Sequence, residues 1–449
     1  MHVTNSQEIL VSSSLNFSNL LVRLTNKGDA LWSLAYGSYK TDDTLAINTR
    51  YIDEYEGKVR MLGYRLWNVF FGSGWLLKWE INNAGKLEKS CCDAKIAQPA
   101  YGQPRGILPT EDGGMYLSGT VTGGVKEDHD KVYFTKTDSA GKGINIVYTN
   151  VKNDTGDAQV FISSFYRLSE GGFVIAGGIE YVKIGGEKDA FILRVDSAGN
   201  KIWTKNYGTK SIEGPARAIP TQDGGFLMYC YSKHFGDGSN YYIYCVKTDS
   251  VGTIQWEKSY LEPNYYANYP VDCIQTKDNG YVLVGKVSTT LSENEGDCLI
   301  LKLDSKGTKQ WSYAYGSPGA DYLESVAELP NGHLIIGGRN NSKMYIAEMT
   351  TPVVGVENSE TPLSTMSLEV SQLQTGETFV RYSNPSTSQV SLTLFNSIGS
   401  MVRQFEDIEN KKAGEYTIEI QANQLQAGVY FLRLSDGKTS ITKPLAIIR

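Results

Sequence analysis

The sequence lacks the features of membrane-spanning, nucleic-acid-binding and coiled-coil proteins. No stretch of its 449 residues approaches the roughly 18 continuous apolar residues of a membrane helix, so we expect no transmembrane segment. Its 43 lysines and arginines are outnumbered by 49 acidic residues and form no basic stripe, which argues against nucleic acid as a partner. Charged residues make up only 20% of the chain, too few for a coiled coil or a disordered protein.

Recognisable catalytic and cofactor-binding motifs are also missing. The chain contains no Gly-x-Ser-x-Gly, no His-Glu-x-x-His and no phosphate-binding loop, and it has only four histidines. His129 lies among carboxylates, and Asp189, Asp237 and Asp297 lie in comparable loops of other repeats, where oxygen ligands could hold a cation. Solvated loop carboxylates explain the same residues more simply. We therefore predict no catalytic residue, no cofactor and no metal site.

The six cysteines form no repeated framework and no Cys-x-x-Cys pair. Cys230 and Cys245 fall on two strands of an expected hairpin, whose loop we centre near residues 235 and 236. That register separates the two thiols by about four residues, or ~13 Å, which is too far for a disulfide. We expect free, mostly buried cysteines.

What the sequence does contain is a repeat, rich in glycine and tyrosine. One part of the repeated motif is an apolar run, followed by Asp-x-x-Gly and then by a strand that contains tryptophan or tyrosine. The glycines of this part recur about 55 residues apart, at Gly28, Gly85, Gly141, Gly199, Gly252 and Gly307. A second part of the motif recurs with the same spacing. It is an apolar run with a glycine at each end, at residues 172–177, 280–285 and 332–337. In one copy the final glycine is replaced by Cys230.

Each repeat unit reads as four antiparallel strands, which we label a to d in chain order. The Asp-x-x-Gly and Asp-Gly-Gly segments are turns in which glycine takes a left-handed conformation. Alternating apolar residues in Leu299–Leu303 indicate a strand. A four-stranded sheet cannot cover both of its faces alone, whereas sheets stacked around an axis can. The repeat therefore predicts an all-β fold, a seven-bladed β-propeller spanning residues 1–350.

The strand count suggests that the ring is incomplete at its N-terminal end. Strands b and c each occur seven times, beginning with strand b at Ile9–Ser13, whereas strands a and d each occur six times. Propellers commonly close by completing one blade from both ends of the chain. We therefore expect that a strand d, a strand a and a signal peptide precede Met1, where residues 1–5 show no leader. The alternative is that Met1 is the true start and that the ring has six blades or closes imperfectly.

A second domain follows the repeats. The repeat itself resembles the propeller repeats common in secreted proteins of Bacteroidetes-type bacteria. Residues 351–366, with two prolines and scattered polar residues, are predicted to be a linker. Cleanly alternating short strands within residues 367–449 then predict a small Ig-like β-sandwich.

The sequence of this tail resembles the C-terminal sorting domain of the type IX secretion system. The resemblance rests on a strand that ends in an Asn-x-x-Gly turn, on a strand with the sequence Leu-x-x-Gly-Val-Tyr-Phe, and on basic residues at the C-terminal end. The residues that carry it are Gly399, Leu425, Gly428, Val429, Tyr430 and Lys443. It implies recognition by the type IX secretion machinery and a secreted or outer cell-surface location. The Pro-Asn-Pro that often opens the family is absent, which leaves the boundary of the first strand open.

We expect the propeller to be a binding module for a glycan or protein ligand. Tyr265, Tyr266 and Tyr269 stand outside the repeat register, so their rings are free to contact a ligand. The alternative is a glycan- or peptide-acting enzyme with its site at the propeller channel. That would require carboxylates or a histidine converging from different blades at positions that break the repeat.

Overall fold

The computed structural model shows an all-β protein, and no described residue lies in a helix. The structure describes residues 1–447 apart from 5–7, 16–17, 26–29, 37–46, 57, 69–72, 96–103, 122–130, 152–157, 182–187, 209–212, 215, 234, 236–239, 264, 291–294, 317–318, 341–342, 350–366, 373–377, 385–387, 397–398, 412–413, 421–424, 427 and 437–439. In this described part of the chain there is thus no helix that could cross a membrane.

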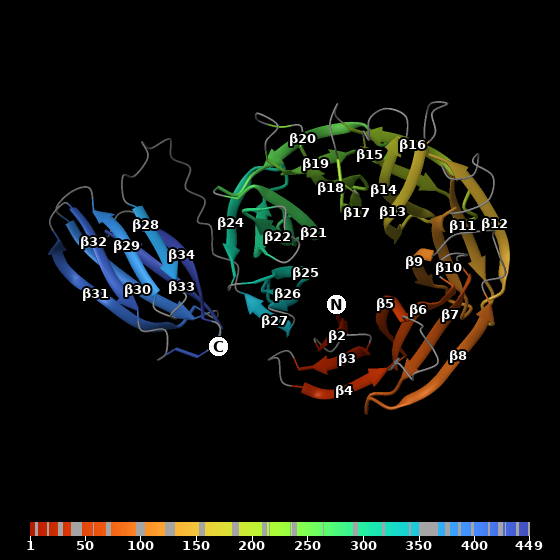
Figure 1. Ribbon diagram of the computed structural model, residues 1–449, viewed down its shortest axis with the longest axis horizontal. Coiled ribbons are helices and arrows are strands. Elements are labelled where there is room, and N and C mark those ends of the chain that lie inside the picture. Colours follow the sequence, from red (N-terminus) through yellow and green to blue (C-terminus); the bar gives the residue numbers. More distant parts are fainter. Residues whose placement is uncertain are drawn as a thin grey trace.

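Strands β1 to β27 form seven antiparallel sheets arranged around a central axis (Figure 1). Blade one contains β1 (His2–Val3), β2 (Ile9–Leu15), β3 (Ser18–Leu24) and β4 (Ala30–Tyr36), and blade two contains β5 (Ile47–Tyr55), β6 (Lys58–Asn68), β7 (Ser73–Ile81) and β8 (Leu87–Lys95). Blade three contains β9 (Pro104–Pro109), β10 (Met115–Thr120), β11 (Lys131–Thr137) and β12 (Gly143–Asn150), and blade four contains β13 (Ala158–Arg167), β14 (Phe173–Tyr181), β15 (Lys188–Val195) and β16 (Lys201–Tyr207). Blade five contains β17 (Arg217–Pro220), β18 (Phe226–Ser232), β19 (Tyr242–Thr248) and β20 (Ile254–Tyr260), and blade six contains β21 (Ala267–Gln275), β22 (Tyr281–Ser288), β23 (Asp297–Leu303) and β24 (Lys309–Tyr315). Blade seven contains β25 (Asp321–Glu328), β26 (Leu334–Asn340) and β27 (Lys343–Met349).

The ring closes by packing between its first and last blades. A hydrophobic cluster fills each interface between neighbouring blades. A further cluster joins Ile9 and Leu24 of blade one to Leu329 and Ile335 of blade seven. Burying each such side chain contributes about 1.5–3 kcal/mol, so every interface stabilises the ring. The prediction of a seven-bladed propeller is confirmed.

Two details of the predicted repeat are corrected. Strand a of blade one is present, because β1 pairs with β2 through Val3 and Ile9. A two-residue strand carries no period-2 pattern, so the sequence could not reveal it. The sheet of blade seven has three described strands, a to c. Its strand b is also shifted by one residue, since the left-handed turn residue is Gly332 and the strand follows His333.

The repeated Trp and Tyr residues hold neighbouring blades together. The Tyr207 hydroxyl of blade four donates a 2.8 Å hydrogen bond to the carbonyl oxygen of Gly252 in blade five. Tyr260 of blade five bonds Gly307 of blade six in the same way, at 2.5 Å. Gly307 has φ +74°, and a Cβ on it would lie 2.8 Å from the ring of Trp256. The tryptophans therefore pack between blades, as the repeat predicts.

In blades two, three, four, six and seven, a glycine in strand b lies opposite a bulge in strand a. In blade six the register of β21 shifts between Pro270 and Asp272, opposite Gly285. A Cβ on Gly285 would overlap the carbonyl oxygen of Tyr269. Where Cys230 replaces this glycine in blade five, β17 pairs only from Arg217 onward. The bulge leaves one residue of strand a without a partner in strand b, which in blade six is Val271.

The expected register of the hairpin formed by β18 and β19 is wrong, although its conclusion stands. Cys230 lies opposite Tyr244, and Cys245 lies opposite Tyr229, so the two cysteines are one residue out of step. They point to opposite faces of the sheet, into different hydrophobic clusters, and both are free and buried. Period-2 alternation, rather than distance along the strands, keeps these thiols apart.

The C-terminal strands form a β-sandwich beside the propeller (Figure 1). One sheet contains β28 (Ser367–Gln372), β29 (Thr378–Asn384) and β32 (Gly414–Ile420), and the other contains β30 (Ser388–Asn396), β31 (Met401–Lys411), β33 (Gly428–Ser435) and β34 (Ser440–Ile447). Phe431 of β33 reaches out of the sandwich into the hydrophobic cluster between blades six and seven. Its ring lies 6.2 Å from that of Tyr313, so the two domains share apolar contacts.

Candidate functional site

A cluster of four tyrosines lies at the seam between blades five and six; we call it the tyrosine cluster. Its members are Tyr231, Tyr241, Tyr266 and Tyr269, which come from three segments of the chain. The rings of Tyr231 and Tyr269 meet edge to face at 5.0 Å, and Tyr241 lies 5.6 Å from Tyr231. The Lys233 ammonium lies 5.1 Å from the centre of the Tyr241 ring, within cation–π range.

Backbone hydrogen bonds across the blade seam fix this arrangement. The Tyr241 N–H donates to the carbonyl oxygen of Tyr266 at 2.9 Å, and the Asn268 N–H donates to that of Tyr241 at 3.0 Å. A parallel bridge between Tyr241 and Ala267 results. The end of the b–c loop of blade five is thus pinned to the start of strand a in blade six. This explains how residues from two blades meet on one rim.

The four rings are half-buried, so each presents part of its surface to solvent. Burial raises the pKa of Tyr269 to about 12, still further above physiological pH than that of an exposed tyrosine. Among the described residues, none of the four hydroxyl groups has a hydrogen-bond partner. The cluster therefore combines apolar faces with unused polar groups.

The tyrosines singled out in the sequence separate into two environments. Tyr266 and Tyr269 belong to the cluster, whereas Tyr265 turns into blade six and donates a 2.7 Å hydrogen bond to Asp297. Tyr231 and Tyr241 were missed by sequence reasoning. The Tyr that follows Cys230 gives only a weak signal, because the same position is Tyr64 in blade two and Thr120, Gly178, Lys286 and Arg339 in blades three, four, six and seven.

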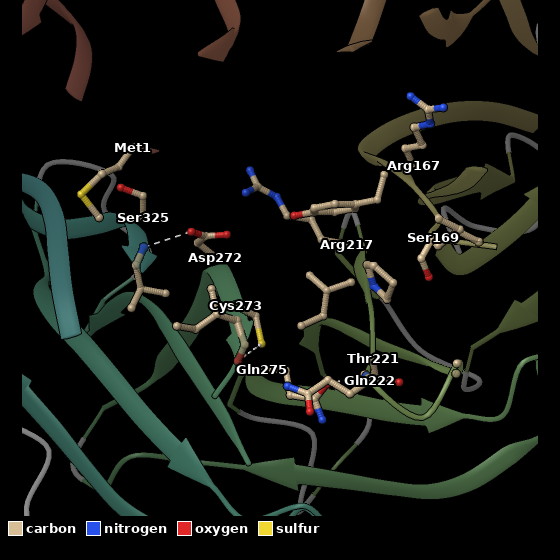
Figure 2. A pocket seen from close by; sticks show the side chains of 18 of the residues that line it. Met1, Arg167, Ser169, Arg217, Thr221, Gln222, Asp272, Cys273, Gln275 and Ser325 are labelled. Atoms are coloured by element: carbon tan, nitrogen blue, oxygen red, sulfur yellow. Dashed lines mark hydrogen bonds between the residues drawn. The ribbon is translucent and has the colours of Figure 1, made fainter. Parts of the chain in front are cut away.

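A second candidate site is a cavity of about 960 Å³ in the propeller channel (Figure 2). Strands a of blades four to seven line it, together with the a–b turns of blades four and five. Arg167 and Arg217 belong to blades four and five, and Asp272 and Glu324 belong to blades six and seven. The cavity therefore has a largely cationic wall and an acidic wall, and the N-terminal ammonium of Met1 lies near Asp272 and Glu324 on the acidic side.

Asp272 lies in the channel at the residue that follows the bulge in its strand. Its Oδ2 accepts a 3.0 Å hydrogen bond from the N–H of Val326 in blade seven. Burial raises the pKa of Asp272, and the Val326 N–H and the Arg217 charge oppose that shift only in part. Arg217 donates from Nη1 to the carbonyl oxygen of Val271 in blade six. Both side chains thus link one blade to the next.

The loop carboxylates considered as cation ligands do not converge in the described structure. Asp297 accepts the Tyr265 hydrogen bond, and Asp189 lies at the start of β15 in another blade. His129 and Asp237 lie outside the described residues. Among the described residues, no three His, Cys, Asp or Glu side chains are grouped closely enough to hold a metal ion.

The residues of the sorting motif divide between the sandwich core and its surface. Leu425 and Tyr430 are buried in the core, and the Tyr430 hydroxyl donates to the carbonyl oxygen of Gln426 at 2.9 Å. Gly399 ends the Asn-x-x-Gly turn with φ +76°. Val429 packs toward the propeller, while Gly428 and Lys443 are exposed.

Comparison with known families identifies this tail. Residues 375–448 match the family described as the secretion system C-terminal sorting domain. The chain therefore carries a type IX sorting domain at its C-terminus and is exported to the cell surface or the medium. No curated protein matches the chain.

Solved structures similar to this one include two proteins of unknown function. The one from Bacteroides caccae is 9% identical, covers 69% of this chain and 94% of its own, and has a TM-score of 0.38. The one from Dyadobacter fermentans is 11% identical with the same coverages and a TM-score of 0.44. Puromycin hydrolase is 8% identical, with coverages of 86% and 60% and a TM-score of 0.45.

Proposed function

We propose that this chain, which leaves the cell by means of its type IX sorting domain, is a glycan-binding β-propeller that uses the tyrosine cluster as its binding surface. The observation that carries the proposal is the convergence of four half-exposed tyrosine rings, from three segments of the chain, at one seam between blades. The positions of Tyr231 and Tyr269 also carry aromatic residues in other blades, namely Tyr64, Phe161 and Tyr322, whereas Tyr241 and Tyr266, joined by the backbone bridge across the seam, complete the group here.

The chemistry of the cluster suits a sugar. The apolar faces of tyrosine rings pack against the C–H faces of a pyranose, and the free hydroxyl groups can exchange hydrogen bonds with its hydroxyl groups. Lys233 places a cation at the edge of the surface, which favours glycans that carry an acidic group. Tyr265, tied to Asp297, supports the loop from below rather than offering a ring to the ligand.

The enzyme alternative has less support from the channel. A hydrolase or lyase there needs two carboxylates available to the substrate. One oxygen of Asp272 already holds the Val326 N–H of the next blade, so this carboxylate is partly committed to the fold.

A glycan array probed with the full chain tests the proposal. Tyr269→Ala and Tyr241→Ala should each weaken binding to the best glycan at least about tenfold, which corresponds to ~1.4 kcal/mol for a lost aromatic contact. The matched control is Tyr148→Ala, because Tyr148 is 47% exposed on β12, far from the cluster. It should leave the affinity unchanged.

Two results would count against a glycan ligand. The first is the absence of any glycan bound by the wild-type chain. The second is equal loss of affinity in the cluster variants and in Tyr148→Ala. Capture of a protein ligand that depends on Tyr269, without glycan binding, would assign the same surface to protein recognition instead.

A further inference from the structure

The channel cavity holds charges that the fold itself does not require. In blade four, the residue after the bulge is Ser164, whose Oγ accepts a 2.9 Å hydrogen bond from the N–H of Ala218 in blade five. Asp272 does the same for Val326 from the equivalent position in blade six. A serine is therefore sufficient for this link between blades. The carboxylate of Asp272 adds a negative charge to a site where burial disfavours one.

The opposite charge stands at the same position of the neighbouring blade. Arg217 follows the bulge position of blade five, and in Figure 2 its guanidinium and the Asp272 carboxylate extend toward the same open space. Among the described residues neither forms a salt bridge, although the Arg217 charge is close enough to influence Asp272. Two opposite charges that face one cavity without pairing leave room for a ligand that bridges them.

The neighbouring blades extend this charge separation. Arg167 lines the cavity with Arg217, and its ion pair with Glu111 is loose at 3.7 Å and largely solvent-exposed. Glu324, the bulge residue of β25, lines the other side with Asp272, and these two carboxylates face a single ammonium of the chain, that of Met1. One negative charge on this side is thus left for a ligand. The volume of about 960 Å³ lies within the range of small-molecule sites.

We infer that the channel is a second binding site, which takes a zwitterionic ligand of the size of an amino acid or short peptide. The ligand's carboxylate would bind the Arg167 and Arg217 wall, and its ammonium would bind the Asp272 and Glu324 wall. Arginine binds a carboxylate through two parallel N–H bonds, and only one guanidinium nitrogen of Arg217 is engaged with Val271. The site is separate from the tyrosine cluster and does not depend on it.

Calorimetric titration of the full chain with three related probes tests each wall. The probes are alanyl-alanine, its N-acetyl derivative, which lacks the ammonium, and its C-terminal amide, which lacks the carboxylate. The wild-type protein should bind alanyl-alanine at least about tenfold more tightly than either blocked probe.

Two variants assign the walls to residues. Asp272→Ser should keep the blade link, as Ser164 does, and should lose the preference for alanyl-alanine over the N-acetyl probe. Arg217→Gln keeps a donor for the Val271 carbonyl and should lose the preference over the amide. Melting temperatures close to wild type would establish that both variants fold. Equal binding of all three probes, no binding of alanyl-alanine at millimolar concentration, or unchanged preferences in the two variants would overturn the inference.

Discussion

Replacing Gly285 by alanine should destabilise the propeller far more than the same change at Gly337. Both residues lie in strand b of neighbouring blades, and neither has a positive φ. A Cβ on Gly285 would overlap the carbonyl oxygen of Tyr269, whereas the nearest atom to a Cβ on Gly337 is the Ser325 Oγ at 3.4 Å. The pair therefore isolates the space needed by the strand-a bulge.

The loss of stability in Gly285→Ala can be estimated from the displacement of strand a that the new Cβ requires. Overpacking costs about 1–3 kcal/mol, and strand a would lose one or two ladder hydrogen bonds worth about 1 kcal/mol each. Alanine gives the unfolded chain less conformational entropy than glycine does, which offsets about 0.4–1 kcal/mol of this loss. Gly285→Ala should therefore cost about 2–3 kcal/mol, and Gly337→Ala should be nearly neutral.

Thermal unfolding followed by circular dichroism measures the difference. With an unfolding entropy of about 2.1 cal/mol/K per residue over roughly 350 residues, 2–3 kcal/mol lowers the melting temperature by about 3–4 °C. Because Tyr269 belongs to the tyrosine cluster, the Gly285→Ala variant should also bind its ligand more weakly. Melting temperatures of the two variants within about 1 °C of each other would show that the bulge does not depend on this glycine.

Two further predictions concern the links within and between blades. Tyr207→Phe removes the buried hydrogen bond to the Gly252 carbonyl and should cost about 1–2 kcal/mol in urea unfolding, and no loss would show that this blade link is not stabilising. Asp278→Asn leaves the Lys302 ammonium, only 4% exposed, without its carboxylate and should cost about 2 kcal/mol, while the control Asp112→Asn, from a more exposed pair, should cost clearly less. Burial acts to raise the pKa of Asp278, but the hydrogen bonds from Lys302, Thr276 and Gly280 outweigh it and lower this pKa. The ion pair therefore stabilises the folded protein fully above the unfolded pKa of about 4, and this stabilisation is lost as the pH falls through the lowered folded-state pKa. The difference between wild type and Asp278→Asn should therefore shrink on acidification below about pH 4, and a constant difference would contradict the ion-pair explanation.

The architecture was predictable from the repeat because its glycines form turns and its aromatic residues pack between neighbouring blades. Gly307 must adopt a positive φ beneath Trp256, and that demand recurs about every 55 residues, so it is visible in the sequence. The boundaries of strands and loops were less predictable where the structure requires no particular residue type. The two-residue strand His2–Val3 has no pattern, and the position of the long loop after Cys230 could not be read from its composition.

The candidate sites were less accessible to sequence reasoning, for a geometric reason. Tyr231 and Tyr241 meet Tyr269 only because a backbone bridge pins the loop of one blade to the first strand of the next. The significance of Asp272 depends on knowing that it follows a bulge and faces the channel. Neither fact has a signature along a single strand.

A propeller supplies its own internal controls, and these separate structure from function at the channel. Ser164 and Asp272 make the same hydrogen bond to the next blade, so the fold can use either side chain. What distinguishes them is charge, and burial disfavours the charge of Asp272 more than the Val326 N–H, Arg217 and the N-terminal ammonium favour it. An aspartate at this position, opposite an arginine that it does not pair with, is therefore better explained by a ligand than by stability. The same comparison predicts that Asp272→Ser will melt at or above the wild-type temperature, and a clear decrease would return Asp272 to a structural role.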